Sequence, residues 1–179
     1  MVGDATGSDL FLLPMGKADG SPRNPIPYQS SSANEDHGAF SPDSRWMAFT
    51  SDESSEPNVY VQAVPASGPK WQISRGGGDY AFWRRDGREL YYVSSDRKLM
   101  AVPVEFGPAG FRAFTPKELF DLQVLQPAFT SGINGQVPYQ PSANGRRFLM
   151  RLSPPGQPVG SPLEITLNWT SGVGAQKRP

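Results

Sequence analysis

The chain has 179 residues, which is enough for one domain with a buried core. Its 17 Lys and Arg balance its 17 Asp and Glu, so a formal net charge of zero gives no electrostatic reason to expect nucleic acid or an anionic membrane as partner. Cysteine is absent and His37 is the single histidine, which excludes disulfides, cysteine nucleophiles and metal sites built from several histidines. We therefore expect no metal, no other cofactor and no nucleic-acid partner.

Glycine and proline contribute 19 residues each, well above their usual share of roughly 12% together. A chain interrupted so often favours many short strands over long helices. Ten Phe, six Tyr and four Trp supply the large side chains for its core. No run approaches the roughly 20 apolar residues of a membrane span, and Met1–Asp9 lacks the basic and apolar regions of a signal peptide. The sequence predicts neither membrane insertion nor a leader in this segment.

In chain order, the first predicted elements are a strand at Asp9–Pro14 and a second at Pro25–Ser30. After them, one ten-residue frame occurs three times, with a one-residue offset at its left edge: an aromatic-bearing run, Asp or Asn, Gly or Ser, Arg, and then a hydrophobic strand. The copies are Phe40–Phe49, Trp83–Tyr92 and Pro141–Met150. Each copy predicts a β-hairpin, because Asp-Gly and Asn-Gly supply the positive φ angles of a tight antiparallel turn. Ser44 replaces the glycine in the first copy, so we expect a looser turn there.

Each predicted hairpin leads into a further strand with alternating polarity: Asn58–Val64, Lys98–Val104 and Leu163–Trp169. Outer strands are expected at Lys70–Ser74 and around Arg112–Phe120. Asp43 and Asp86 are 43 residues apart, which is the period of one propeller blade, and the 58 residues from Asp86 to Asn144 allow a blade with an insertion. We therefore predict an all-β chain, a segment of a β-propeller with about three four-stranded antiparallel blades in an incomplete ring. The expected units are a half blade at 9–30, whose first two strands we expect before Met1, blades at 38–75 and 79–121, a last blade at 137–169, and a tail at 170–179.

The segments Ala39–Ser54 and Trp83–Tyr92 resemble the "SPDG" repeat of TolB-like, WD40-like (PD40) β-propellers. The run from Asn58 to Gly78 is similar to the propeller at the C-terminus of some bacterial membrane-anchored Ser/Thr protein kinases. The resemblance implies a binding platform and, within a longer chain, a periplasmic or extracytoplasmic location. It implies no kinase activity, because the chain has no Gly-rich loop, strand lysine, H-R-D or D-F-G motif.

The motifs that could carry catalysis have simpler structural explanations. The run Gly76–Gly78 precedes a strand, whereas a phosphate cradle opens a helix, so it indicates a connection between blades. No G-x-S-x-G elbow is present and His37 has no catalytic motif around it. The acidic residues at 52–56 lack the spacing of a calcium loop and indicate a solvated hairpin tip. We expect no catalytic residue and no enzymatic activity.

A better candidate site comes from three segments that each precede the first strand of a blade: 34–38, 77–80 and 134–139. The first strand of a blade is innermost in a propeller, so we expect these loops to gather at the mouth of the central channel. Their polar and aromatic residues would suit a ligand or peptide. The candidate binding residues are Glu35, Asp36, His37, Asp79, Tyr80, Gln136 and Tyr139. The alternative is that these segments are ordinary connecting loops.

The function expected from the sequence is a non-enzymatic binding or scaffold module for a protein, a peptide or a small ligand. The alternative is a sensor or accessory propeller from a larger enzyme, either a receptor-like Ser/Thr kinase or a prolyl-oligopeptidase-like peptidase. An arc of about three blades leaves open strand edges, which invite pairing with other chains. The sequence therefore also predicts either a fragment of a longer propeller or a self-associating arc.

Overall fold

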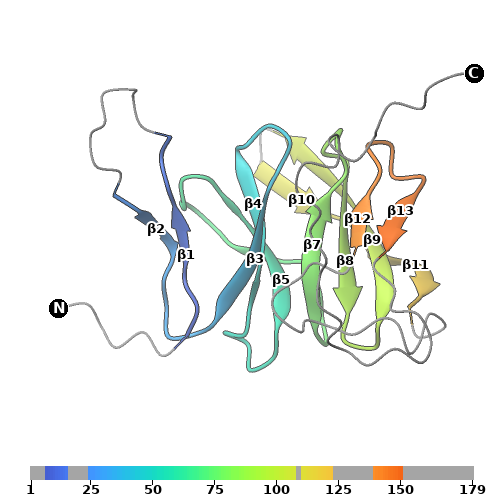
Figure 1. Ribbon diagram of the computed structural model, residues 1–179, viewed down its shortest axis with the longest axis horizontal. Helices are drawn as coiled ribbons and strands as arrows, with labels where there is room; N and C mark the ends of the chain where they lie inside the picture. Colours follow the sequence, from blue (N-terminus) through green and yellow to red (C-terminus); the bar gives the residue numbers. More distant parts are fainter. Residues whose placement is uncertain (1–6, 16–23, 108–109, 123–138, 151–179) are drawn as a thin grey trace, which may run out of the picture.

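The computed structural model describes residues 7–15, 24–107, 110–122 and 139–150, and every regular element in these residues is a β-strand. The predicted all-β class is confirmed. The strands form antiparallel groups that follow one another in chain order across the molecule, as Figure 1 shows. No helix in this part of the chain has the length and apolar character to cross a membrane.

Two of the groups are full blades with the strand order of the sequence. Blade 1 contains β3 (Glu35–Phe40), β4 (Trp46–Ser51), β5 (Asn58–Ala63) and β6 (Trp71–Gln72). Blade 2 contains β7 (Gly78–Trp83), β8 (Glu89–Ser94), β9 (Lys98–Gly107), β10 (Gly110–Ala113) and β11 (Lys117–Asp121). Both β10 and β11 pair with β9. The outer strand expected around Arg112–Phe120 is thus two strands, and Pro116, which has no N–H to donate, lies between them.

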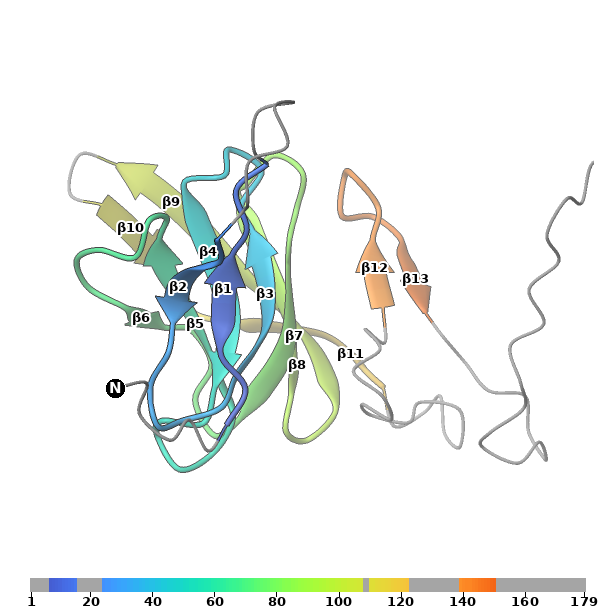
Figure 2. The ribbon, with the colours of Figure 1, turned by 60° about the vertical axis from the view of Figure 1, so that its left-hand side comes forward.

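A two-stranded sheet lies at each end of the row. The N-terminal pair consists of β1 (Leu10–Leu12) and β2 (Ile26–Gln29), and the C-terminal hairpin consists of β12 (Tyr139–Pro141) and β13 (Phe148–Met150). Figures 1 and 2 place these two sheets at opposite ends, and the described strands form no closed ring. The expected strand at Leu163–Trp169, the tail at 170–179 and Gln136 lie outside the described residues.

The three predicted hairpins share one turn geometry. Ser44, Gly87 and Gly145 occupy the same position with φ of 58°, 71° and 67°. In each turn this residue donates its N–H to the carbonyl three residues earlier, over 2.8–2.9 Å. The side chain of the preceding Asp or Asn accepts the N–H of the following Arg in all three copies. The looser turn expected at Ser44 is therefore wrong, because the Asp43 side chain fixes the same turn without a glycine.

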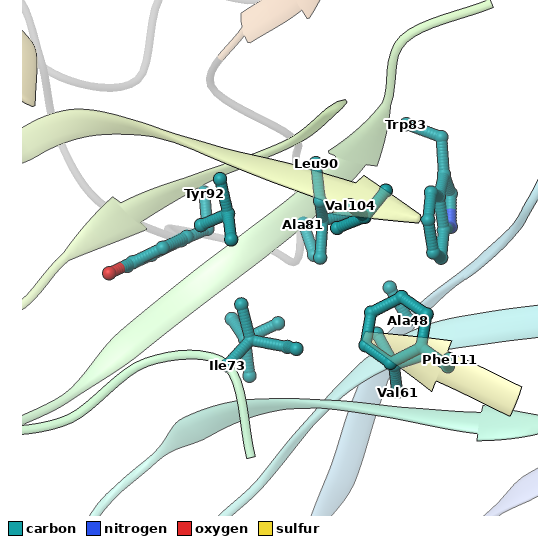
Figure 3. Close-up of a cluster of buried hydrophobic side chains, with 11 residues drawn as sticks. Ala48, Val61, Ile73, Ala81, Trp83, Leu90, Tyr92, Val104 and Phe111 are labelled. Atoms are coloured by element: carbon teal, nitrogen blue, oxygen red, sulfur yellow. The ribbon is translucent and has the colours of Figure 1, made fainter. Parts of the chain in front are cut away.

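The core that unites the two blades lies between their facing sheets. Ala48, Val59 and Val61 of blade 1 pack against Leu90 and Val102 of blade 2, and all five are 0% exposed. Figure 3 shows the side chains of the two blades meeting in this layer. Because side chains alternate along a strand, each sheet contributes every second residue to this layer. Burial of these apolar side chains supplies the main attraction between the blades.

Aromatic rings close one end of this layer. The indoles of Trp46, Trp71 and Trp83 surround Phe111, with ring centroids 5.5–6.3 Å from its own. Phe106 stacks on Trp46, and the Trp83 indole N–H donates to the Ala39 carbonyl at 3.0 Å. Rings at such separations add to the attraction that their buried area provides. The aromatic residues therefore supply core volume in a chain with few aliphatic ones.

The shared turn predicts opposite effects for two substitutions. Ser44→Gly should stabilise the protein by about 0.5–1 kcal/mol. A left-handed conformation costs an L-residue roughly 1–2 kcal/mol, and the larger conformational entropy that glycine loses on folding offsets part of this gain. Gly87→Ala should destabilise it by about 1 kcal/mol. The added Cβ would lie 3.8 Å from its nearest neighbours, so crowding would not explain the loss. Urea unfolding of both variants measures these changes. Effects of the same sign would contradict the common turn.

Candidate functional site

Both inner strands contain a β-bulge at the same place. On β3 the register shifts between Asp36 and Ala39, and on β7 it shifts between Asp79 and Phe82. The residue after each aspartate has a positive φ, 53° for His37 and 55° for Tyr80. Positive φ is uncommon for residues other than glycine, so the two blades repeat an unfavourable backbone conformation at equivalent positions. The bulges turn the side chains of adjacent blades towards each other.

His37 and Asp79 join the two blades at this point. The His37 Nδ1 lies 2.8 Å from the Asp79 Oδ1, and the two side chains are 22% and 32% exposed. The same Oδ1 accepts the Thr50 hydroxyl at 2.7 Å and the Tyr80 backbone N–H at 2.6 Å. Since a carboxylate only accepts hydrogen bonds, His37 carries its proton on Nδ1. This tautomer leaves Nε2 for other contacts.

The pair shifts both of its pKa values in the direction that favours the ionised forms. The hydrogen bond to Asp79 raises the pKa of His37 against the opposing effect of burial, and the charges of Asp79 and Asp36 raise it further. Burial alone would raise the pKa of Asp79, but the hydrogen bonds from His37 and Thr50, the charge of His37 and the Tyr80 backbone N–H together outweigh burial and lower it. The two shifts make the ionised pair most favourable in mildly acidic solution.

Aromatic rings extend the cluster to the C-terminal hairpin. The rings of His37 and Tyr80 have centroids 4.4 Å apart. Tyr139 of β12 is only 3% exposed, and its hydroxyl donates to the Tyr80 carbonyl at 2.8 Å. Burial raises the pKa of Tyr139 well above its usual value, so its hydroxyl stays protonated. Tyr139 therefore positions Tyr80 and the bulge of β7.

Two hollows flank the His37–Asp79 pair. The larger hollow has a volume of about 390 Å³, and its lining includes Pro57, Tyr80, Val93 and Arg97. The smaller hollow has a volume of about 90 Å³, and most of the residues that line it are polar, among them Asn34, Asp36, His37, Thr50 and Asp52. Asp79 and Pro57 belong to both walls. A ligand in the larger hollow would therefore lie against Asp79, which accepts the hydrogen bonds of His37, Thr50 and the Tyr80 backbone.

A third hollow, of about 710 Å³, lies at the other end of blade 2. Gly87, Phe106 and Arg112 contribute to its lining. The Arg112 guanidinium stacks on the Phe114 ring at 4.6 Å, so part of its polar surface is already engaged. The bulged strand segments lie at the opposite ends of β3 and β7, and none of their residues lines this hollow.

The candidate residues lie on strands, where the sequence predicted loops before the strands. Glu35, Asp36 and His37 are in β3, Asp79 and Tyr80 are in β7, and Tyr139 begins β12. The correction has a simple cause: pairing with β4 begins as early as Glu35, opposite Ser51, and pairing with β8 begins at Gly78.

The structure brings four of the candidate residues into contact: His37, Asp79, Tyr80 and Tyr139. Asp36 lines the smaller hollow and accepts a hydrogen bond from the Ser8 hydroxyl. Glu35 is fully buried, accepts the Ser31 hydroxyl and lines neither of these hollows. Their role in binding stays a prediction.

The hydrogen bonds of the cluster differ from those of a histidine-activated nucleophile. Thr50 donates its hydroxyl proton to Asp79, and no hydroxyl among the described residues is hydrogen-bonded to His37. A histidine-activated nucleophile needs that contact. In the same part of the chain, His, Asp and Glu side chains form no group of three or more suited to a metal ion.

Sequence reasoning missed Thr50 and the hollow beside Pro57, although one usable signal was present. Asp36 and Asp79 each stand seven residues before the turn aspartates Asp43 and Asp86. This equal spacing places the two acidic groups at one height on neighbouring inner strands. Thr50 has no such signal, because it reaches Asp79 only through the packing of blade 1 on blade 2.

No family model matches the sequence, and no curated protein matches it either. Among solved structures, the crystal structure of TolB from Acinetobacter baumannii is similar, with a TM-score of 0.45 and 17% sequence identity. The match covers 75% of this chain and 41% of the TolB chain, so this chain spans less than half of that protein.

The His37–Asp79 pair predicts a stability maximum in mildly acidic solution. A raised His37 pKa contributes stability below about pH 6.5, and this contribution is lost as the pH rises through the folded value. A lowered Asp79 pKa contributes stability above about pH 4, and this contribution is lost as the pH falls through its folded value. We expect wild type to be less stable to urea at pH 8.5 than at pH 5.5, because the contribution of the raised His37 pKa is lost over this range.

Urea unfolding of His37→Gln at the same two pH values is the matched control. Glutamine still donates a hydrogen bond to Asp79 but does not titrate, so its stability should be nearly equal at both. A loss in His37→Gln as large as that of wild type would assign the pH dependence to other groups.

Proposed function

We propose that the protein is a non-enzymatic binding module that takes a peptide or a small ligand in the hollow beside Asp79. The observation that carries this proposal is the convergence of β3, β7 and β12 on one point, where the His37–Asp79 hydrogen bond adjoins an open hollow of about 390 Å³. Its size falls within the usual range of ligand pockets, and it combines apolar walls with a few polar groups.

The charges around the hollow support a ligand with hydrogen-bond donors. Asp79 and Glu56 contribute carboxylates to the wall, and Arg97 contributes a guanidinium. The Asp79 Oδ1 already accepts three hydrogen bonds, whereas Oδ2 has no hydrogen bond within the described residues. A peptide amide or an amine could donate to this oxygen while an apolar group contacts Pro57 and Tyr80. Asp79 and Tyr80 lie near the start of β7, the first strand of blade 2. The sequence predicts that the starts of these first strands surround the mouth of the channel.

The backbone strain at the site supports a functional origin for the bulges. Two non-glycine residues at positive φ, His37 and Tyr80, cost of order 1–3 kcal/mol each, and such conformations cluster at ligand sites. We therefore attribute the bulges to the need to bring His37, Asp79 and Tyr80 together.

A second candidate function uses the same hollow within a larger protein. In it, the chain is the sensor or accessory propeller of an enzyme such as a receptor-like Ser/Thr kinase or a prolyl-oligopeptidase-like peptidase. The resemblance of the segment from Asn58 to Gly78 to kinase-linked propellers favours this candidate. The coding sequence upstream of Met1 distinguishes the two: a kinase or peptidase domain in the same reading frame would favour the second.

The binding proposal predicts where a ligand perturbs the protein. A library of capped di- and tripeptides, screened by amide chemical shifts, should yield binders that shift Gly77, Asp79 and Ser95. Asp79→Asn should weaken these binders about tenfold, which is the loss expected for a charge-assisted hydrogen bond of about 1.4 kcal/mol. Arg112→Gln, in the hollow at the other end of blade 2, is the matched control and should leave their affinity unchanged. Shifts confined to Gly87 and Phe106, or affinities that the Asp79 variant leaves intact, would place the site elsewhere.

A further inference from the structure

The two terminal sheets are complementary halves of one blade. The turn at Asn144–Gly145 identifies β12 and β13 as the counterparts of β3 and β4, the first and second strands of blade 1. The N-terminal pair leads into the inner strand β3 as β5 and β6 lead into the inner strand β7. The pair therefore corresponds to the third and outer strands of a blade. Together the described strands of the two sheets fill each strand position once.

Side chains in the full blades alternate between two neighbours. On β5, Val59 and Val61 pack towards blade 2, whereas Tyr60 packs towards the N-terminal pair. On β8, Leu90 packs towards blade 1, whereas Tyr91 packs towards the C-terminal hairpin. We call the side turned to the preceding sheet the front face and the side turned to the following sheet the rear face. In both blades these faces are buried at the second and third strands.

Each terminal sheet buries one face and exposes the other. In the N-terminal pair, Leu12 packs on its rear face against blade 1, and Phe11, which points the other way, is 51% exposed. Its counterpart Tyr60 is 5% exposed. In the C-terminal hairpin, Phe148 packs on its front face against blade 2, and Leu149 on the rear face is 73% exposed. Within the described part of the chain, the uncovered faces are thus the front of one half and the rear of the other.

The free strand edges are complementary as well. In the described residues β13 pairs only with β12, and β1 pairs only with β2. In blade 1 the strands at these two positions, β4 and β5, pair with each other over six residues. Two-stranded sheets are marginally stable by themselves, and an open edge is a template for another strand.

We propose that β13 of one copy pairs antiparallel with β1 of a second copy, so that two half sheets form one four-stranded blade. The register follows from blades 1 and 2, where Ala48 lies opposite Val61 and Tyr91 opposite Ala101. The same register sets Leu149 opposite Leu12 of the second copy. Phe11 of the second copy then extends the front face that Phe148 begins, and Leu149 extends the rear face that Leu12 begins. One junction covers both exposed patches.

The two half sheets lie at opposite ends of one chain, so a single copy cannot join its own (Figures 1 and 2). The contact is heterologous, since it joins different surfaces of two identical chains, and such contacts close into rings when the rotation allows. Two copies with two junctions would contain about six blades, within the range of four to eight blades in closed propellers.

Engineered cysteines test the junction and its register, because the chain has no native cysteine. Chains with Leu12→Cys are mixed with chains that carry Leu149→Cys and an affinity tag, and the mixture is oxidised. The backbone bonds from Val64 to Arg45 and from Val104 to Arg88 make this register position a non-hydrogen-bonded pair, whose short Cα separation suits a disulfide. The expected product is a mixed disulfide dimer. Equal or greater yield of dimers within either single population would overturn the proposal.

Sedimentation tests the assembly without a cross-link. Wild type should sediment as a dimer of the 19.5 kDa chain or a larger species, and Phe11→Asp and Leu149→Asp should each be monomeric. Because each variant spoils a different half, an equimolar mixture of the two should recover a dimer with one intact junction. Far-UV circular dichroism checks that both variants keep their strands. A monomeric wild type at its highest soluble concentration, as expected if another segment of the same chain occupies β13, would overturn the proposal. So would a mixture that stays monomeric.

Discussion

Alternate side chains of β4 and β5 pack against alternate side chains of β7, β8 and β9, and this sheet-on-sheet burial fixes how far apart the two inner strands lie. Leu90 and Val102 have no exposed surface, so neither blade can shift on the other without opening a cavity. The ring cluster around Phe111 closes one end of the same layer. The rigid spacing lets a short hydrogen bond form between side chains of two separate sheets at the other end.

The hydrogen bond between His37 and Asp79 holds the groups of the candidate site together. Asp79 accepts from His37 and Thr50 of blade 1 and from the backbone of its own blade, so one carboxylate unites both blades. The bulges that present these groups are the most strained part of the inner strands. Ionisation of the pair links the blade contact to pH, and in the proposed function a ligand in the adjacent hollow would contact the same carboxylate. The proposed binding site and the packing of the two blades therefore share Asp79.

In the two terminal sheets the same alternation of side chains continues, with one face of each sheet uncovered by any residue that the structure describes. Phe11 and Leu149 occupy positions that are buried in blades 1 and 2. Each of the two terminal sheets thus has one face that packs as a blade face and one that meets solvent. The same regularity that buries side chains between the two blades leaves one apolar face of each terminal sheet as a surface that another sheet could cover.

Local chemistry determined the parts of this protein that the sequence predicts well. Turn residues such as Asp43 and Gly87 act within a few residues of themselves, so the repeated hairpins and the all-β class follow from the sequence. The bulges, the shared acceptor Asp79 and the hollow beside Pro57 do not. His37 and Asp79 are 42 residues apart, and only the packing of one blade on the other sets the distance between their side chains. Tertiary structure decided the site because its contacts run between sheets, where no periodicity along the chain specifies which atoms meet.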